Sequence, residues 1–155
     1  MYTHSINSFP RHSHIMPKIL LQMTPDGAQT IATDEAGNQA TMYLPESAGG
    51  SQQGIRPMQM LLMGMAGCTA VDVLLILKKQ RQEVRDFRIE LEAEREADKE
   101  PSVWQSARLV FYIAGPVDPQ KAQRAVELSV QKYCSAAETL RRAGANIEWE
   151  IKLQP

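Results

Sequence analysis

The chain has 155 residues and a formal net charge of −1, with 43% hydrophobic and 23% charged residues. This length and composition are typical of one soluble globular domain with a buried core, and they exclude a disordered or fibrous chain. A nearly neutral chain without a basic tail does not favour nucleic acid as its partner.

The first 16 residues have the character of an extension ahead of the domain. Residues 1–15 lack the apolar core of a secretion signal. His12 and His14 could hold a metal adventitiously, but a disordered extension explains this polar segment more simply. We therefore expect an N-terminal extension at 1–16, a single domain at 17–155 and a cytoplasmic location.

Residues 18–44 predict a three-stranded antiparallel meander. Its strand-like segments at 18–23, 28–35 and 38–44 are separated by turn residues, of which Pro25-Asp26-Gly27 is the clearest set. The segment 46–54 that follows is rich in glycine and serine and has no periodic pattern, so we expect a mobile loop there.

Residues 56–81 form the longest apolar segment, RPMQMLLMGMAGCTAVDVLLILKKQR, and predict a central helix with Pro57 in its first turn. The segment is long enough to span a membrane, but Gln59, Thr69 and Asp72 fall within it. An aspartate at the centre of a bilayer costs about 3 kcal/mol. We therefore expect a buried core helix and no membrane partner.

The central helix also predicts the oligomeric state. Apolar residues cover nearly all its faces, and one chain with two small sheets cannot surround it. Gly64 and Gly67 are costly in a helix interior, about 1 kcal/mol each relative to alanine, which suggests close approach by another backbone. We expect a homodimer in which two central helices pack together.

The remaining elements complete an α+β fold. The alternating segment 87–93 and the segment 104–113 predict a long hairpin, and 147–153 predicts a last strand. The order is βββ–α–ββ–α(α)–β, with strands linked mostly as hairpins, so we expect antiparallel sheets around the buried helix.

Two helices are expected between the hairpin and the last strand. Asp118-Pro119 is a strong helix start, and this helix should run to about Tyr133. Ser135 and Glu138 have the spacing of a capping box, which predicts that a second helix begins at Ser135. Gly144 lies where this second helix would end.

The two cysteines are the strongest candidates for chemistry. Cys68 lies mid-helix and is either a small buried hydrophobe or a reactive thiol, and Asp72, four residues later, shares its face. Cys134 is expected at a helix N-terminus, where the helix dipole favours thiolate, although packing is the alternative and the cap could belong wholly to Ser135.

Two such cysteines could act as a peroxidatic and resolving pair, if the fold brings them together. The sequence has no CxxC, GxSxG or HExxH motif and no phosphate-binding glycine loop, so we expect no metal and no bound cofactor.

Two segments carry a resemblance to a known family. Pro57–Asp72 (PMQMLLMGMAGCTAVD) and Lys132–Gly144 (KYCSAAETLRRAG) resemble the two cysteine motifs of the OsmC/Ohr family, the osmotically inducible and organic hydroperoxide resistance proteins. The resemblance covers roughly residues 16–153 and implies an intertwined homodimer with active sites at the interface. It also implies reduction of organic hydroperoxides, with Cys68 as the peroxidatic thiol, Cys134 as the resolving thiol and an external thiol protein or small dithiol as reductant.

The sequence departs from the hydroperoxide-reducing members at two supporting positions. Their glutamate after the helix-starting proline corresponds to Met58, followed by Gln59, and no arginine lies between Met16 and Ile55. Arg56 or Arg11 could substitute for that arginine. The alternative function is therefore an OsmC-like dimer that binds a small hydrophobic or thiol ligand at its interface without fast turnover.

Overall fold

The computed structural model describes residues 17–155, so the expectations for the extension at 1–16 and for Arg11 lie outside the described residues. The described chain divides into two compact units between Pro57 and Met58. The single domain expected at 17–155 stays a prediction.

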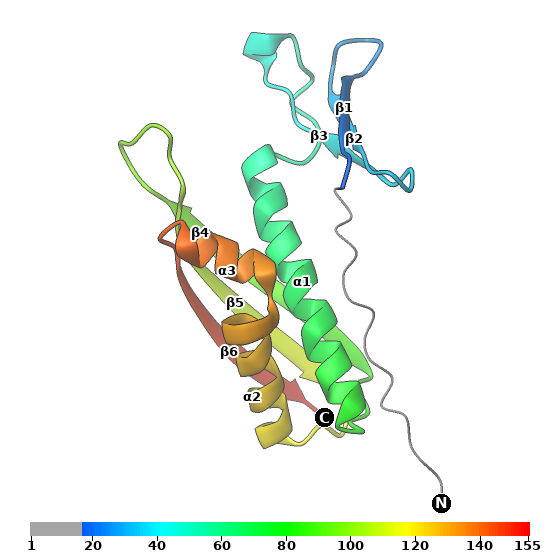
Figure 1. Ribbon diagram of the computed structural model, residues 1–155, viewed down its shortest axis with the longest axis vertical. Helices are drawn as coiled ribbons and strands as arrows, with labels where there is room; N and C mark the ends of the chain where they lie inside the picture. The colour runs from blue at the N-terminus through cyan, green and yellow to red at the C-terminus, as the bar shows by residue number, and fades with distance from the viewer. Residues whose placement is uncertain (1–16) are drawn as a thin grey trace, which may run out of the picture. The chain divides into compact units, whose positions relative to one another are not determined.

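The N-terminal unit is the predicted meander. Strands β1 (Leu20–Met23), β2 (Thr30–Thr33) and β3 (Gln39–Met42) pair antiparallel in the order β1-β2-β3 (Figure 1). Its turns form because aspartate side chains accept backbone N–H groups two residues on, as Asp26 does from Ala28 at 3.0 Å. The segment expected to be a patternless loop contains one 3₁₀ turn, η1 (Glu46–Ala48).

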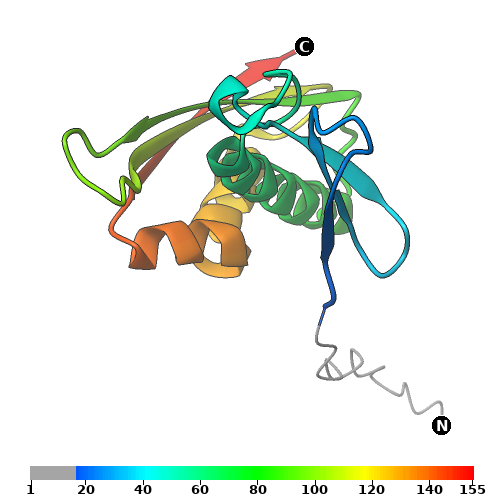
Figure 2. The same ribbon diagram turned by 90° about the horizontal axis from the view of Figure 1, so that it is seen from above.

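The second unit contains three helices and one three-stranded sheet. Its elements, in order, are α1 (Pro57–Lys79), β4 (Asp86–Arg95), β5 (Trp104–Ala114), α2 (Pro119–Leu128), the π-helical turn η2 (Ser129–Tyr133), α3 (Ser135–Arg142) and β6 (Asn146–Gln154). The helices lie on the same face of the sheet β4-β5-β6, as the view from above shows (Figure 2). This arrangement confirms the α+β class and the order of elements.

The sheet of the second unit corrects one expectation. Strands β4 and β5 form the predicted antiparallel hairpin, but β6 pairs with β5 in parallel, from Ser106 opposite Asn146 to Ala114 opposite Gln154. The expectation of wholly antiparallel sheets was wrong because α2, η2 and α3 form a helical crossover between these strands. A crossover of this kind returns the chain to the end at which β5 began.

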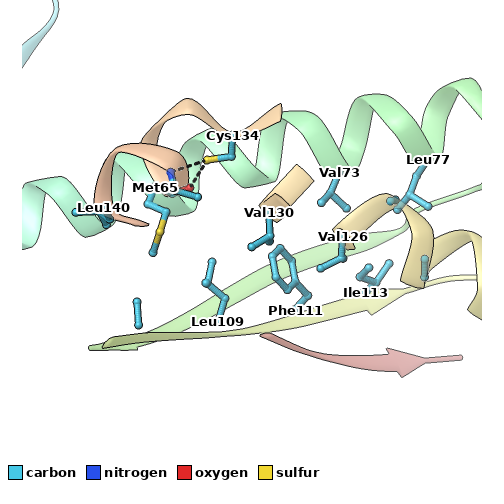
Figure 3. Packing of buried hydrophobic residues seen from close by; sticks show 14 of the residues in the cluster. Met65, Val73, Leu77, Leu109, Phe111, Ile113, Val126, Val130, Cys134 and Leu140 are labelled. Atoms are coloured by element: carbon cyan, nitrogen blue, oxygen red, sulfur yellow. Dashed lines mark hydrogen bonds between the residues drawn. The ribbon is translucent and has the colours of Figure 1, made fainter. Parts of the chain in front are cut away.

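The core lies between α1, the crossover helices and β5. Phe111, Leu109 and Ile113 from β5 are fully buried against Val126 of α2 and Val130 of η2 (Figure 3). Alternation along β4 and β6 brings their apolar side chains to the same face, while the charged side chains of these strands face away.

Helix α1 is buried along one face in this single chain, and the homodimer expected to cover its other faces stays a prediction. Met65, Thr69, Val73 and Leu77, spaced four residues apart, are its buried residues. Its large exposed apolar side chains are 39–58% exposed, and they are Leu61, Met63, Val71, Leu74 and Leu75. By length and composition α1 could cross a membrane, and its buried residues are part of the core of the second unit.

Candidate dithiol site

A π-helical turn places Cys134 against α1. The Cys134 N–H donates to the Ser129 carbonyl at 2.9 Å, five residues back, and the backbone of Cys134 is extended, so the preceding helix stops there. Arg141 of α3 donates to the Val130 carbonyl at 2.8 Å and ties the turn to the next helix. Such π turns often occur at functional sites, because they shift the side chains that follow.

Cys134 itself is the N-cap of α3. Its Sγ accepts the Ala137 N–H at 3.3 Å, and its S–H donates toward the Met65 carbonyl of α1 at 3.8 Å (Figure 3). The predicted capping box at Ser135 and Glu138 was therefore wrong by one residue. Glu138 instead accepts from Arg141 at 2.6 Å and from Arg142 at 2.8 Å, and these hydrogen bonds, that of Arg142 being the larger cause, hold its pKa below the usual value.

The fold brings the two cysteines together. Cys68 is half-buried on α1, Cys134 is 2% exposed, and both are free thiols. After burial, the Cys68 side chain is the next cause that raises the pKa of Cys134, so the two side chains are near neighbours. Two neighbouring free thiols on separate elements are candidates for a reversible disulfide.

The electrostatics of Cys134 differ from the expectation. Burial, followed by the hydrogen bond with Cys68, raises the pKa of Cys134 from 9.0 to about 12, although the Ala137 N–H acts in the opposite direction. The α3 N-terminus was expected to favour the thiolate, but removal from water outweighs it. Cys134 therefore keeps its proton at neutral pH.

Asp72 and the π turn are joined by a buried hydroxyl. The Ser129 Oγ–H lies 3.2 Å from Asp72 Oδ2 and 3.3 Å from the Thr69 carbonyl, and Ser129 is fully buried. Because the Ser129 carbonyl also accepts from the Cys134 N–H, this one residue connects the α1 turn after Cys68 to the backbone of Cys134.

Comparisons with known proteins identify the family of this chain. The model of the family described as OsmC-like protein matches residues 49–150. This chain belongs to the OsmC-like protein family. Protein YhfA of Escherichia coli (strain K12) is 38% identical over 111 residues, which cover 65% of this chain and 82% of that protein.

Solved structures show the same fold. A hypothetical protein from Aquifex aeolicus VF5 is 30% identical, with a TM-score of 0.72 over 89% of this chain and 97% of that one. The organic hydroperoxide resistance protein OhrB of Bacillus subtilis is 21% identical, with a TM-score of 0.62 over 90% and 100% of the two chains. The likeness to OhrB supports the fold alone.

The other predicted site residues of this OsmC-like protein have distinct environments. Arg56 belongs to the N-terminal unit, where its guanidinium lies 5.4 Å from the ring centre of Tyr43. Gln59 lies nine residues before Cys68 on α1, about 13 Å along the axis and on about the opposite side of the helix. The roles of Arg56, Gln59 and Asp72 at the thiol stay predictions.

Two residues that sequence reasoning missed help to shape the site. Ser129 stands among the apolar residues on the buried side of the α2–η2 segment, and a hydroxyl at such a position is a recognisable signal for a buried hydrogen bond. Arg141 looks like an ordinary surface cation of a short helix. Its hydrogen bond to Val130 could not be expected, because it depends on a carbonyl in the π turn.

Proposed function

We propose that this protein reduces organic hydroperoxides through Cys68 and Cys134, with electrons from an external thiol or dithiol, in defence against oxidative stress. The observation that carries the proposal is that two free thiols, one half-buried and the other buried, are near neighbours. Membership of the OsmC-like family and the fold shared with a hydroperoxide resistance protein support it.

The two sulfurs would divide the reaction between them. The Cys68 thiolate attacks the terminal oxygen of the hydroperoxide, the O–O bond breaks, and the alkoxide leaves and takes a proton to become an alcohol. Cys68 is then a sulfenic acid. The Cys134 sulfur attacks it, the Cys134 proton leaves with the hydroxyl as water, and a disulfide forms. An external dithiol returns two electrons and two protons.

A direct test compares two cysteine variants in peroxide consumption. The purified protein should consume cumene hydroperoxide with dithiothreitol as reductant, and Cys68→Ser should abolish this activity because no thiolate remains to attack the peroxide. The matched control is Gln123→Ala, an exposed residue of α2 that makes no side-chain hydrogen bond to either sulfur in the described structure. Unchanged turnover in Cys68→Ser would remove the proposal.

We also propose that the protein is a homodimer through α1. Five large apolar side chains of α1 are exposed in the single chain, and a Cβ added at Gly64 or Gly67 would meet nothing within 4 Å. Val71→Glu should therefore yield a monomer in light scattering, because it would bury a charge in the interface. Gln123→Glu adds the same charge on exposed α2 and should leave the dimer intact.

One observation favours the alternative, a ligand-binding dimer. A cavity of about 310 Å³ lies between α1 and β4, with mostly apolar lining from Leu62, Met63, Ala66, Ile89 and Leu91, together with Gln59. The sequence also lacks the glutamate and arginine expected from the hydroperoxide-reducing members. A hydrophobic or thiol ligand retained in native mass spectrometry, without peroxide consumption, would support this function instead.

A further inference from the structure

A cavity at the protein surface has Cys134 among its lining residues and does not include Cys68. The cavity has a volume of about 300 Å³ and is formed where η2 meets α3. It is lined by Lys132, Tyr133, Cys134, Ser135, Glu138, Thr139 and Arg142. Most of these side chains are exposed, with Tyr133 50% exposed at its edge, so a small molecule can enter it.

We propose that this cavity, named here the Cys134 cavity, is the docking site for the external reductant, which attacks the Cys134 sulfur of the oxidised protein. The proposal rests on the dithiol chemistry proposed above. For the last step of that chemistry, it specifies where the reductant binds and which of the two sulfurs it attacks. Hydroperoxide would then meet the protein at Cys68, and the reductant would meet it at Cys134.

The charge of the Cys134 cavity suits the attacking species. Lys132 and Arg142 face a single carboxylate, Glu138, so the lining carries a net positive charge of one. A reducing thiol reacts as its thiolate, which is an anion. A positive lining raises the local concentration of such an anion and favours its ionised form over the neutral thiol.

The leaving group also favours attack at Cys134. Exchange is slower when the expelled thiol has a high pKa, and burial raises the pKa of Cys134 to about 12. An attack on the Cys68 sulfur would expel Cys134. An attack on the Cys134 sulfur expels Cys68 first, so Cys134 leaves only in the second, intramolecular step.

The electron count of the step is complete with a dithiol. One thiolate of the reductant bonds to Cys134, the Cys68–Cys134 bond breaks, and Cys68 leaves with the electron pair and takes a proton. The second thiol of the reductant then attacks its own first sulfur and forms a cyclic disulfide. Cys134 leaves with the second electron pair and takes the second proton, so the reductant loses two electrons and two protons.

The first experiment maps the attacked sulfur in the unmodified protein. The disulfide is formed with diamide, so that the mapping does not depend on peroxide activity. Brief reaction with the monothiol N-acetylcysteine, alkylation of the released thiol and peptide mass spectrometry should find the mixed disulfide on Cys134 and the alkyl group on Cys68. A mixed disulfide mainly on Cys68 would overturn the proposal.

The second experiment blocks the Cys134 cavity. Thr139→Trp places a large side chain in the lining, and the rate constant for reduction of the diamide-formed disulfide by dithiothreitol should fall about 10-fold or more. The rate of disulfide formation by cumene hydroperoxide should stay within about two-fold, since that step begins at Cys68. A variant with unchanged reduction would overturn the docking site, even if peroxidase activity is present.

A charge-reversal variant tests whether the reductant is bound by the charges of the Cys134 cavity or only passes through it. Lys132→Glu should slow reduction by the dianionic dimercaptosuccinate more than reduction by neutral dithiothreitol, and added salt should narrow the difference. Lys121→Glu makes the same change on an exposed lysine outside the lining and should have little effect. Equal effects of the two variants would overturn the proposed docking site. Absence of oxidation by hydroperoxide, with slower reduction of the diamide-formed disulfide in Thr139→Trp, would remove the peroxidase proposal alone.

Discussion

The segments that carry Cys68 and Cys134 are built in different ways, although the two side chains are near neighbours. Cys68 sits within a regular helix of 23 residues, half-buried, with exposed apolar residues along the same helix. Cys134 sits at an interruption between two short helices, where a π turn, a helix cap and a contact with the Met65 carbonyl fix its position. Cys68 therefore belongs to a continuous helix, whereas Cys134 lies where one helical segment ends and the next begins.

This difference has a consequence for the proposed chemistry. A half-buried thiol on a rigid helix suits the first meeting with a substrate. A buried thiol that keeps its proton suits a second step, in which that proton leaves with the hydroxyl of the sulfenic acid. The comparison predicts that equivalent changes at the two sulfurs will affect different steps.

After the loss of activity expected for Cys68→Ser, the largest expected effect comes from Cys134→Ser. Turnover with dithiothreitol should fall by about 100-fold or more, because the Cys68 sulfenic acid no longer has its intramolecular partner. The first oxidation should continue, and a sulfenic-acid reagent followed by mass spectrometry should label Cys68. Cys68→Ser should give no labelling at Cys134, and labelling there would reverse the two roles.

A smaller effect is expected where the two segments are joined. Ser129→Ala removes the donor that lies 3.2 Å from Asp72, and should lower the free energy of unfolding by about 2 kcal/mol, since hydrogen bonds to charged groups have this size. Urea unfolding under reducing conditions measures the change. Ser135→Ala, an exposed neighbour, should change it by less than about 0.5 kcal/mol. Equal effects of the two substitutions would mean that Ser129 does not join the segments.

The last expected effect is a dependence of stability on pH, which appears only in alkaline solution. The pKa of Cys134 is 9.0 unperturbed and about 12 in the folded protein, so the folded state keeps a proton that the unfolded state loses. The stabilising contribution is complete below pH 9 and is lost as the pH rises toward 12. Between pH 9 and 12, the free energy of unfolding of the parent protein should therefore fall more than that of Cys134→Ser. A constant difference would contradict the raised pKa.

Local sequence patterns predicted a helix end, a turn or a strand correctly where that feature depends on a few consecutive residues. Asp118 accepts the Lys121 N–H at 2.9 Å as the predicted cap of α2. Gly144 ends α3 with a φ of 103°, which non-glycine residues rarely adopt, and its N–H donates to the Arg141 carbonyl at 3.0 Å. The meander and the hairpin follow from alternation and turn residues in the same way.

Local sequence patterns gave a wrong prediction where a contact with a distant segment changed the local structure. Ser135 and Glu138 have the spacing of a capping box, but Cys134 takes the cap because the π turn ends one residue earlier, against α1. The dipole argument for a Cys134 thiolate failed for a related reason. The helix end was predicted correctly, but the burial that outweighs it depends on α1 packing over that end.

The sequence by itself determined the type and order of the elements, the family resemblance and the two cysteines as candidates. Periodicity, caps and turns act over a few residues, so they can be read along the chain. Tertiary structure alone decided that β6 runs parallel to β5, that the two cysteine side chains are near neighbours, and that Cys134 is buried and keeps its proton. These properties depend on distance and burial between remote segments, which no local pattern specifies.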